Sequence, residues 1–182
     1  MKLAKNKGIE NISDTVIPLA ISSVDVNTSQ LVMFTSERFY DNRIIYNNKV
    51  KIWEAVRASI SFPGIIKPKI IDKRRLIDGG VRDNVPTKVL KRLNADKIIA
   101  VNLGYCGELK EEVDNIIEII SQTIDIMSYN NFKCNLGEID YLIKPNIYDV
   151  HLLEINRINE CIRRGYEYTH QIIPEIKYKL GI

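Results

Sequence analysis

Apolar residues in the first third of the chain follow strand-like and then helix-like spacing. Residues 16–25 and 31–35 are apolar runs rich in β-branched side chains, and residues 27–29 between them have the composition of a turn. The sequence therefore predicts a hairpin-like pair of strands. Residues 51–60 place apolar side chains at helical offsets, and the pair Pro63-Gly64 breaks that pattern. We expect a short helix that ends by Phe62.

The middle of the chain predicts two short strands and then a helix. The apolar pairs at residues 70–71 and 76–77 are separated by a polar turn at residues 72–75. Residues 84–86 predict a helix start, because Pro86 tolerates the first helical position, where its missing N–H removes no hydrogen bond. We expect this helix to run to about Leu93.

The last part of the chain predicts one more strand and two helices. Residues 97–103 form an uninterrupted apolar run, which is typical of a strand that a parallel sheet buries on both faces. Residues 111–127 predict an amphipathic helix, and residues 152–180 a final helix that is bent or broken near Pro174. Strands and helices that alternate in this way indicate the α/β class. We expect the apolar stripe of the first helix to pack on the core rather than to contact lipid, and its members are Val113, Ile116, Ile117, Ile120, Ile124 and Met127.

Composition and charge narrow the class of protein. A chain of 182 residues with 45% hydrophobic side chains is long enough to bury one core. Its 26 basic and 23 acidic side chains leave a formal charge of +3, so nucleic acid is not an expected partner. No apolar run approaches the roughly 20 residues that cross a bilayer, and the charged residues 1–8 are not followed by the apolar segment of a secretory signal. The sequence therefore predicts a cytoplasmic protein.

The cysteines and histidines lack the spacing of a disulfide framework or of a metal site. Cys106, Cys134 and Cys161 are far apart and odd in number, which favours reduced thiols. His151 and His170 are separated by a predicted helical stretch and form no motif of metal ligands. We therefore expect neither a metal nor a cofactor.

One acidic residue occupies a position that suits chemistry. Asp78 ends the predicted strand of Leu76 and Ile77, and Gly79-Gly80 follow it at once. Glycines allow the backbone to turn sharply, so the carboxylate can project into a cleft at the C-terminal end of the strand, where α/β folds place their sites. The alternative is an aspartate that only caps a turn.

Several blocks of sequence, in order, resemble the patatin-like phospholipases. The blocks are residues 17–25 with Phe34-Thr35-Ser36, residues 53–59 with Phe62-Pro63-Gly64 and Pro68, Leu76-Ile77-Asp78-Gly79-Gly80 with Asn84-Val85-Pro86, residues 96–102, and Gly165-Tyr166. The resemblance runs from about Asn11 to the C-terminus. It implies a patatin-like three-layer α/β/α sandwich in which residues 1–182 are the C-terminal part of a single domain, with the N-terminal strands and the nucleophile helix missing.

The resemblance also implies a role for Asp78. In this family an aspartate and a serine form a catalytic dyad that hydrolyses lipid acyl esters, as phospholipases A and lysophospholipases do, and Asp78 matches the aspartate. A carboxylate with a pKa near ~4 is a weak base at neutral pH. Such a dyad therefore needs a partly dry pocket and an oxyanion hole.

The nucleophile of the resemblance is not found in the sequence. The family's serine lies in a Gly-x-Ser-x-Gly elbow, and none of the serines here has glycines at both offsets. Ser59 and Ser61 align with the Arg-Ala-Ser block and are not expected to be nucleophiles. We therefore expect a chain that carries the aspartate but not the serine and that is inactive alone. The alternative is a non-catalytic remnant, or a binding or scaffold subunit that needs a partner chain.

The resemblance implies partners as well. We expect a lipid or phospholipid acyl ester as substrate, peripheral contact with a membrane, and either self-association or a partner chain that supplies the N-terminal part. A basic cluster precedes Asp78 and is compatible either with anionic headgroups or with a solvated hairpin face. Its members are Lys67, Lys69, Lys73, Arg74 and Arg75.

Overall fold

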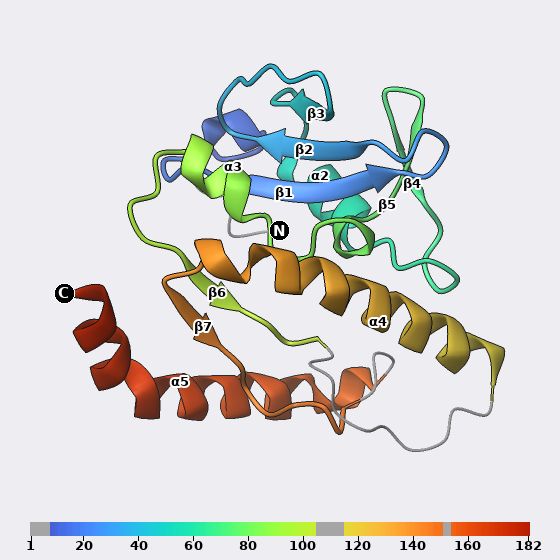
Figure 1. Ribbon diagram of the computed structural model, residues 1–182. Coiled ribbons are helices and arrows are strands. Elements are labelled where there is room, and N and C mark those ends of the chain that lie inside the picture. The colour runs from blue at the N-terminus through green and yellow to red at the C-terminus, as the bar shows by residue number, and fades with distance from the viewer. Residues whose placement is uncertain (1–7, 105–114, 151–153) are drawn as a thin grey trace.

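Two β-sheets organise the part of the chain that this computed structural model describes, which is residues 8–104, 115–150 and 154–182 (Figure 1). The larger sheet has five strands in the order β3-β2-β1-β5-β4, and the smaller one pairs β6 with β7. The strands are β1 (Ala20–Asp25), β2 (Leu31–Thr35), β3 (Ile44–Asn47), β4 (Lys69–Ile71), β5 (Arg74–Asp78), β6 (Ile99–Val101) and β7 (Tyr141–Ile143). The helices are α2 (Ile52–Ser59), α3 (Thr87–Arg92), α4 (Ile116–Asn135) and α5 (Ile158–Leu180), with 3-10 turns η1 (Ile12–Asp14), η2 (Gly79–Val81), η3 (Leu136–Glu138) and η4 (Ile155–Arg157).

The larger sheet is mainly antiparallel. β1 pairs with β2 and β5, and β4 pairs with β5, all antiparallel, whereas β2 and β3 are parallel. Both predicted strand pairs are confirmed, and the predicted strand at residues 31–35 coincides with β2. β1 begins later than predicted, at Ala20, because Val16 and Ile17 are exposed and unpaired with the sheet. The sequence did not predict β3, whose four residues include only one apolar pair.

Helices cover both faces of this sheet. In β2, Val32 and Phe34 point toward α2 and pack with Ala55 and Ala58 of that helix. Leu31 and Met33 point to the other face, where α3 contributes Val89. Successive side chains of a strand alternate between the two faces, so β2 is buried throughout. The helix, sheet and helix form the three layers that the sequence predicted.

β6 is shorter than the predicted strand at residues 97–103 and is less buried than predicted. It is parallel to β7, with Ile99 opposite Tyr141, so the prediction of a parallel strand is confirmed. Ile98, Ala100 and Asn102 are buried, whereas Ile99, Val101 and Leu103 are 45%, 53% and 56% exposed. The prediction of burial on both faces is therefore wrong for β6, because the described residues cover only one of them.

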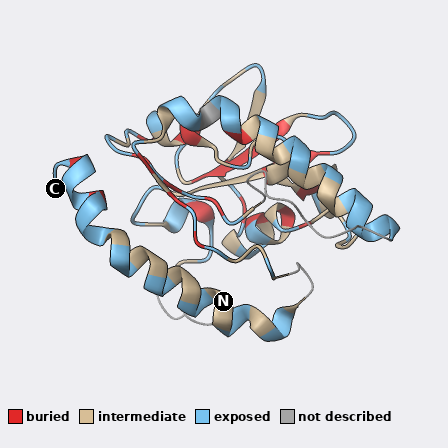
Figure 2. Ribbon diagram, turned by 60° about the horizontal axis from the view of Figure 1, so that its bottom comes forward, coloured by how far each residue is buried: buried red, intermediate tan, exposed pale blue. Residues whose placement is uncertain are grey.

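The two long helices have largely accessible surfaces (Figure 2). Of the predicted apolar stripe, Val113 lies outside the described residues, and Ile116, Ile117, Ile120 and Met127 are exposed. The prediction that these four pack on the core is wrong. α4 continues past Met127 to Asn135 and is buried chiefly at Phe132.

α5 is continuous through Pro174, so the predicted final helix is not broken there. Figure 1 shows it changing direction toward its C-terminal end. A proline inside a helix removes one main-chain hydrogen bond and favours such a bend. In the described part of the chain no helix is both long and apolar enough to cross a bilayer.

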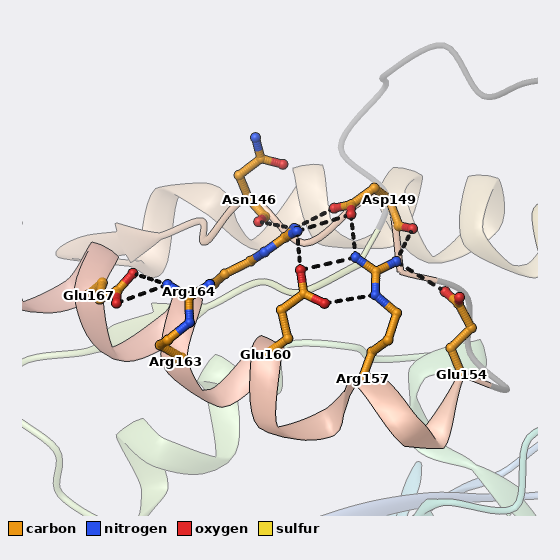
Figure 3. A network of polar contacts seen from close by, with 8 residues as sticks. All are labelled: Asn146, Asp149, Glu154, Arg157, Glu160, Arg163, Arg164 and Glu167. Atoms are coloured by element: carbon orange, nitrogen blue, oxygen red, sulfur yellow. Dashed lines mark hydrogen bonds and ion pairs between the residues drawn. The ribbon is translucent and has the colours of Figure 1, made fainter.

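An ion-pair network connects α5 to the segment before it (Figure 3). Arg157 Nη2 and Arg164 Nη1 donate to the two carboxylate oxygens of Asp149, at 2.7 and 2.5 Å. Both arginines also bind Glu160, with Arg157 Nε at 2.8 Å from Glu160 Oε2. The network fixes the N-terminal turns of α5 against the loop after β7.

Candidate functional site

Asp78 is held by three neighbouring segments at the end of β5. Its main chain lies opposite Ser23 of β1 in the antiparallel ladder. Its N–H donates to the carbonyl of Ser61, at 3.1 Å, and its carboxylate Oδ1 accepts the N–H of Gly80, at 2.8 Å. The location of the aspartate at a strand end is as the sequence predicted, and it also caps the turn that follows.

Gly79 is required by close packing. A Cβ added to Gly79 would lie 2.2 Å from Ser22 Oγ and 2.6 Å from the Ser22 carbonyl carbon. Gly79 does not have a positive φ; the described glycines that do are Gly8, Gly64 and Gly181. The glycine is therefore needed because β1 passes too close for a side chain, and the expected need for unusual backbone angles is not found.

A cavity of about 290 Å³ opens beside Asp78. Segments far apart in the sequence form it: the loop after α2, the end of β5 with η2, the end of β6, and α4. Its polar lining consists of Asp78, Asn84, Asn102, Asp125, Ser128 and Tyr129, and its apolar lining of Phe62, Val81, Val101, Leu103, Ile124 and Phe132, with Gly80 and Gly104 completing the wall. A pocket that combines apolar walls with convergent polar groups can bind a small organic molecule, and this cavity has both in equal number.

Burial raises the pKa of the Asp78 carboxyl above its ordinary value, and the hydrogen bond from the Gly80 N–H partly opposes this rise. A carboxylate with a raised pKa accepts a proton more readily than an ordinary one. The direction of the shift therefore suits a general base.

α4 supplies residues to this site that the sequence did not predict. Ser128 Oγ donates to the Gly80 carbonyl at 2.9 Å, and Asn131 Nδ2 to the Val81 carbonyl at 3.5 Å, so α4 anchors the turn after Asp78. Asp125 and Tyr129 line the cavity beside Ser128. One signal was present in the sequence: Asp125, Ser128 and Tyr129 recur at offsets of three and four residues, which places them on one face of a helix, next to Ile124 of the isoleucine stripe.

Asn102 is the other site residue without a sequence prediction. It follows β6, is buried, and its Oδ1 accepts the N–H of Gly104 at 3.0 Å. A polar residue that ends an apolar run is the signal that could have identified it.

The serines do not form a dyad with Asp78 in the described segments. Ser61 is fully buried, and its hydroxyl bonds with Arg57 instead of facing the cavity. Ser128 lines the cavity, but its hydroxyl donates to Gly80 and it lies within a helix rather than at a strand-to-helix turn. Neither position matches a nucleophile elbow.

Two members of the basic cluster before Asp78 have acidic partners. Lys69 pairs with Glu54 at 2.8 Å, and Arg74 pairs with Asp25 at 3.3 Å. Lys69 also lies over the Trp53 ring, 4.7 Å from its centroid. These contacts favour the interpretation of the cluster as a hairpin face over that of a headgroup site.

Comparison with known proteins shows which family the sequence resembles. The family model of the patatin-like phospholipases matches residues 4–91, which include Asp78 and α2. This region of the chain is therefore patatin-like, and the resemblance drawn from the sequence is confirmed.

Individual relatives agree with this assignment. The chain is similar to lysophospholipase NTE1 of Meyerozyma guilliermondii, with 40% identity over 150 residues that cover 69% of this chain and 10% of the relative. It is similar to lysophospholipase nte1 of Aspergillus terreus, with 39% identity over 157 residues, or 72% of this chain and 10% of the relative. An uncharacterised NTE family protein of Mycobacterium tuberculosis is 31% identical over 102 residues, or 56% of this chain and 27% of the relative. The chain thus spans between about a tenth and about a quarter of the length of these relatives.

Proposed function

We propose that this chain contributes the general base, Asp78, to a patatin-like hydrolase of lipid acyl esters whose nucleophilic serine lies on a segment outside the 182 residues. The observation that carries the proposal is the half-buried Asp78 carboxylate, which lines a cavity whose walls are partly apolar. In this view residues 1–182 are the C-terminal part of one patatin-like domain, and the substrate is a phospholipid or lysophospholipid. The relatives named lysophospholipases support this choice of substrate class.

The proposed chemistry uses Asp78 as a proton acceptor. The carboxylate takes the proton of the serine hydroxyl as its oxygen attacks the ester carbonyl, and an acyl-serine forms when the alcohol leaves with that proton. Water then attacks the acyl-serine and releases the fatty acid, with Asp78 again as base. The apolar lining suits an acyl chain, and limited access of water strengthens the interaction between the carboxylate and the serine hydroxyl.

Reconstitution tests the proposal. The region of a patatin-like relative that bears Gly-x-Ser-x-Gly is fused to this chain or co-expressed with it, and hydrolysis of a chromogenic short-chain ester and of lysophosphatidylcholine is measured. We expect hydrolysis to appear and Asp78→Asn to reduce it by about 10²–10⁴-fold, the usual loss when a general base is removed. The matched control is Glu167→Gln, an exposed carboxylate on α5 whose contact is Arg163. Retained activity in Asp78→Asn would remove Asp78 from the mechanism.

A second candidate is a non-catalytic subunit that binds a partner chain. The observation that favours it is the exposure of three apolar side chains in β6 and directly after it, Ile99, Val101 and Leu103, although Val101 and Leu103 also line the cavity. Exposed strands with apolar side chains pair readily with other chains. Stable association without any hydrolysis in the reconstituted protein would support this reading over the first.

A further inference from the structure

The edge of β5 next to Asp78 is hydrogen-bonded to a loop instead of to a strand. β4 pairs with β5 only as far as the Lys69–Leu76 pair, so in the described structure this edge has no strand beyond Leu76. At that point the Asp78 N–H donates to the carbonyl of Ser61, at 3.1 Å. Ser61 lies two residues after α2. The loop after α2 therefore replaces a strand at the residue whose carboxylate faces the cavity.

Arg57 holds this loop in place from the last turn of α2. Its Nη1 donates to Ser61 Oγ at 2.7 Å, and Ser61 Oγ donates back to the Arg57 carbonyl at 2.8 Å. Its Nη2 donates to the Lys67 carbonyl at 2.9 Å. One guanidinium thus joins both ends of the segment 61–67.

The same segment forms part of the cavity wall. Phe62 follows Ser61 and lines the cavity, and its carbonyl accepts the N–H groups of Ile65 and Ile66, at 3.2 and 2.9 Å. Gly64 turns the chain with a φ of +82°, in the left-handed region that glycine adopts freely. The loop is a compact turn, and its contact with α2 is made through a charged donor, a class of hydrogen bond stronger than that between neutral groups.

We propose that Arg57 is a positioning residue for Asp78: its guanidinium fixes Ser61 and Lys67, the Ser61 carbonyl then holds the Asp78 main chain, and Phe62 shields the carboxylate from water. Arg57 acts only through Ser61 and Phe62. The significance of this role rests on the proposed function of Asp78, but the contacts themselves do not.

Amide hydrogen exchange and carboxyl titration by NMR test the role on the whole chain, without any need for activity. In Arg57→Met the apolar stem of the side chain is kept and both hydrogen bonds of the guanidinium, to Ser61 Oγ and to the Lys67 carbonyl, are lost. We expect the Asp78 amide to exchange at least about tenfold faster, while the amides of Val32 and Phe34 in the core of β2 keep their protection. We also expect the pKa of the Asp78 carboxyl to fall toward its ordinary value, because water gains access when Phe62 moves.

Two further variants and one control sharpen the test. Arg57→Lys can form one of the two hydrogen bonds that the guanidinium donates. The exchange rate of the Asp78 amide in this variant should therefore lie between those of the wild type and Arg57→Met. Ser61→Ala keeps the carbonyl but removes the hydroxyl that Arg57 holds, so it should also be intermediate, and both variants remain informative if Arg57→Met does not fold. The matched control is Arg163→Met on α5, whose partner is Glu167, and it should leave Asp78 unchanged.

Two results would overturn the proposal. Unchanged exchange and titration of Asp78 in these variants would show that Arg57 does not position it. An equal loss of protection at Asp78 and throughout β2 would assign Arg57 to general stability instead. Failure of ester hydrolysis on reconstitution would affect the proposed function but leave these measurements as they are.

Discussion

Gly79 lies so close to Ser22 of the neighbouring strand that a Cβ on Gly79 would be 2.2 Å from the Ser22 hydroxyl oxygen. The Ser22 carbonyl carbon would be only 2.6 Å away, so rotation of the serine side chain cannot relieve the contact. β1 and the turn after β5 must therefore move apart if any side chain is introduced, and the Asp78 carboxylate would move with them.

Gly79→Ala is expected to destabilise the fold by about 1–3 kcal/mol, the usual effect of overpacking. Urea unfolding followed by circular dichroism measures it. Gly165→Ala is the control, because a Cβ at that position on α5 meets nothing within 4 Å, and it should be neutral or stabilise by up to about 1 kcal/mol. Equal stability of Gly79→Ala and the wild type would contradict the close approach.

Asp78→Asn is expected to leave stability at pH 7 unchanged or slightly higher. The pKa of Asp78 is higher in the folded chain than in the unfolded one, so ionisation at neutral pH opposes folding, and this opposition disappears as pH falls through the folded and then the unfolded value. The amide oxygen of asparagine can still accept the Gly80 N–H. The urea concentrations at the unfolding midpoint of the wild type and of Asp78→Asn, measured between pH 7 and pH 4, check this expectation. Any excess stability of the variant over the wild type should shrink toward pH 4. Marked unfolding of Asp78→Asn at pH 7 would favour a purely turn-capping aspartate.

The chain by itself is expected to show no ester hydrolysis above background and no labelling by a fluorophosphonate probe. The reason is that its sequence contains no Gly-x-Ser-x-Gly elbow, and Ser128, the serine among the described residues that line the cavity, donates its hydroxyl to the Gly80 carbonyl. Hydrolysis is measured as turnover of a chromogenic short-chain ester. Labelling is measured by mass spectrometry of the chain after treatment with the probe. Labelling that Ser128→Ala abolishes would reveal an unpredicted nucleophile and contradict the expectation.

The exposed edge of β6 is expected to cause association. The Ile98 carbonyl and the Asn102 N–H bond with β7, so by strand alternation the main-chain groups of Ile99 and Val101 face away from it. Val101→Lys should reduce the apparent mass in light scattering at high concentration, because charge on an edge strand opposes pairing. Val16→Lys, at a site 92% exposed outside the sheets, is the control. A wild-type chain that is monomeric at every concentration would contradict the prediction.

The N-terminal part of α5 is expected to loosen in acid. Hydrogen bonds from Arg164 and Arg157 lower the pKa of Asp149, and those from Arg157 chiefly lower that of Glu160. A carboxylate whose pKa is lower in the folded chain than in the unfolded chain stabilises the fold at any pH above its unfolded pKa, which is near ~4. That stabilisation is lost as the pH falls through the pKa of the folded state. The protection factors of the α5 amides, which are corrected for the intrinsic pH dependence of exchange, should therefore fall below about pH 4, and Asp149→Asn should flatten this dependence. A pH profile that Asp149→Asn leaves unchanged would show that the network does not control α5.

Local sequence patterns determined much of the larger sheet. The β-branched run at residues 31–35, the breaker pair after α2 and the proline before α3 each act through nearby residues, and their elements were predicted correctly. Asp78 was assigned to a strand end for the same reason, since Leu76 and Ile77 precede it and Gly79 follows.

Burial and the site depended on contacts that periodicity does not encode. The apolar residues of β6 and of the first turns of α4 have the pattern of core residues, yet Val101 and Ile116 are exposed, because burial requires a covering segment as well as an apolar side chain. Only the tertiary structure brought Ser128 to the Gly80 carbonyl and the Ser61 carbonyl to the Asp78 N–H. It also gave the reason for Gly79, since the distance to Ser22 depends on how β1 and β5 pair. The sequence determined the elements and the acidic residue through local propensities, whereas long-range packing decided the cavity around that residue and the raised pKa of its carboxyl.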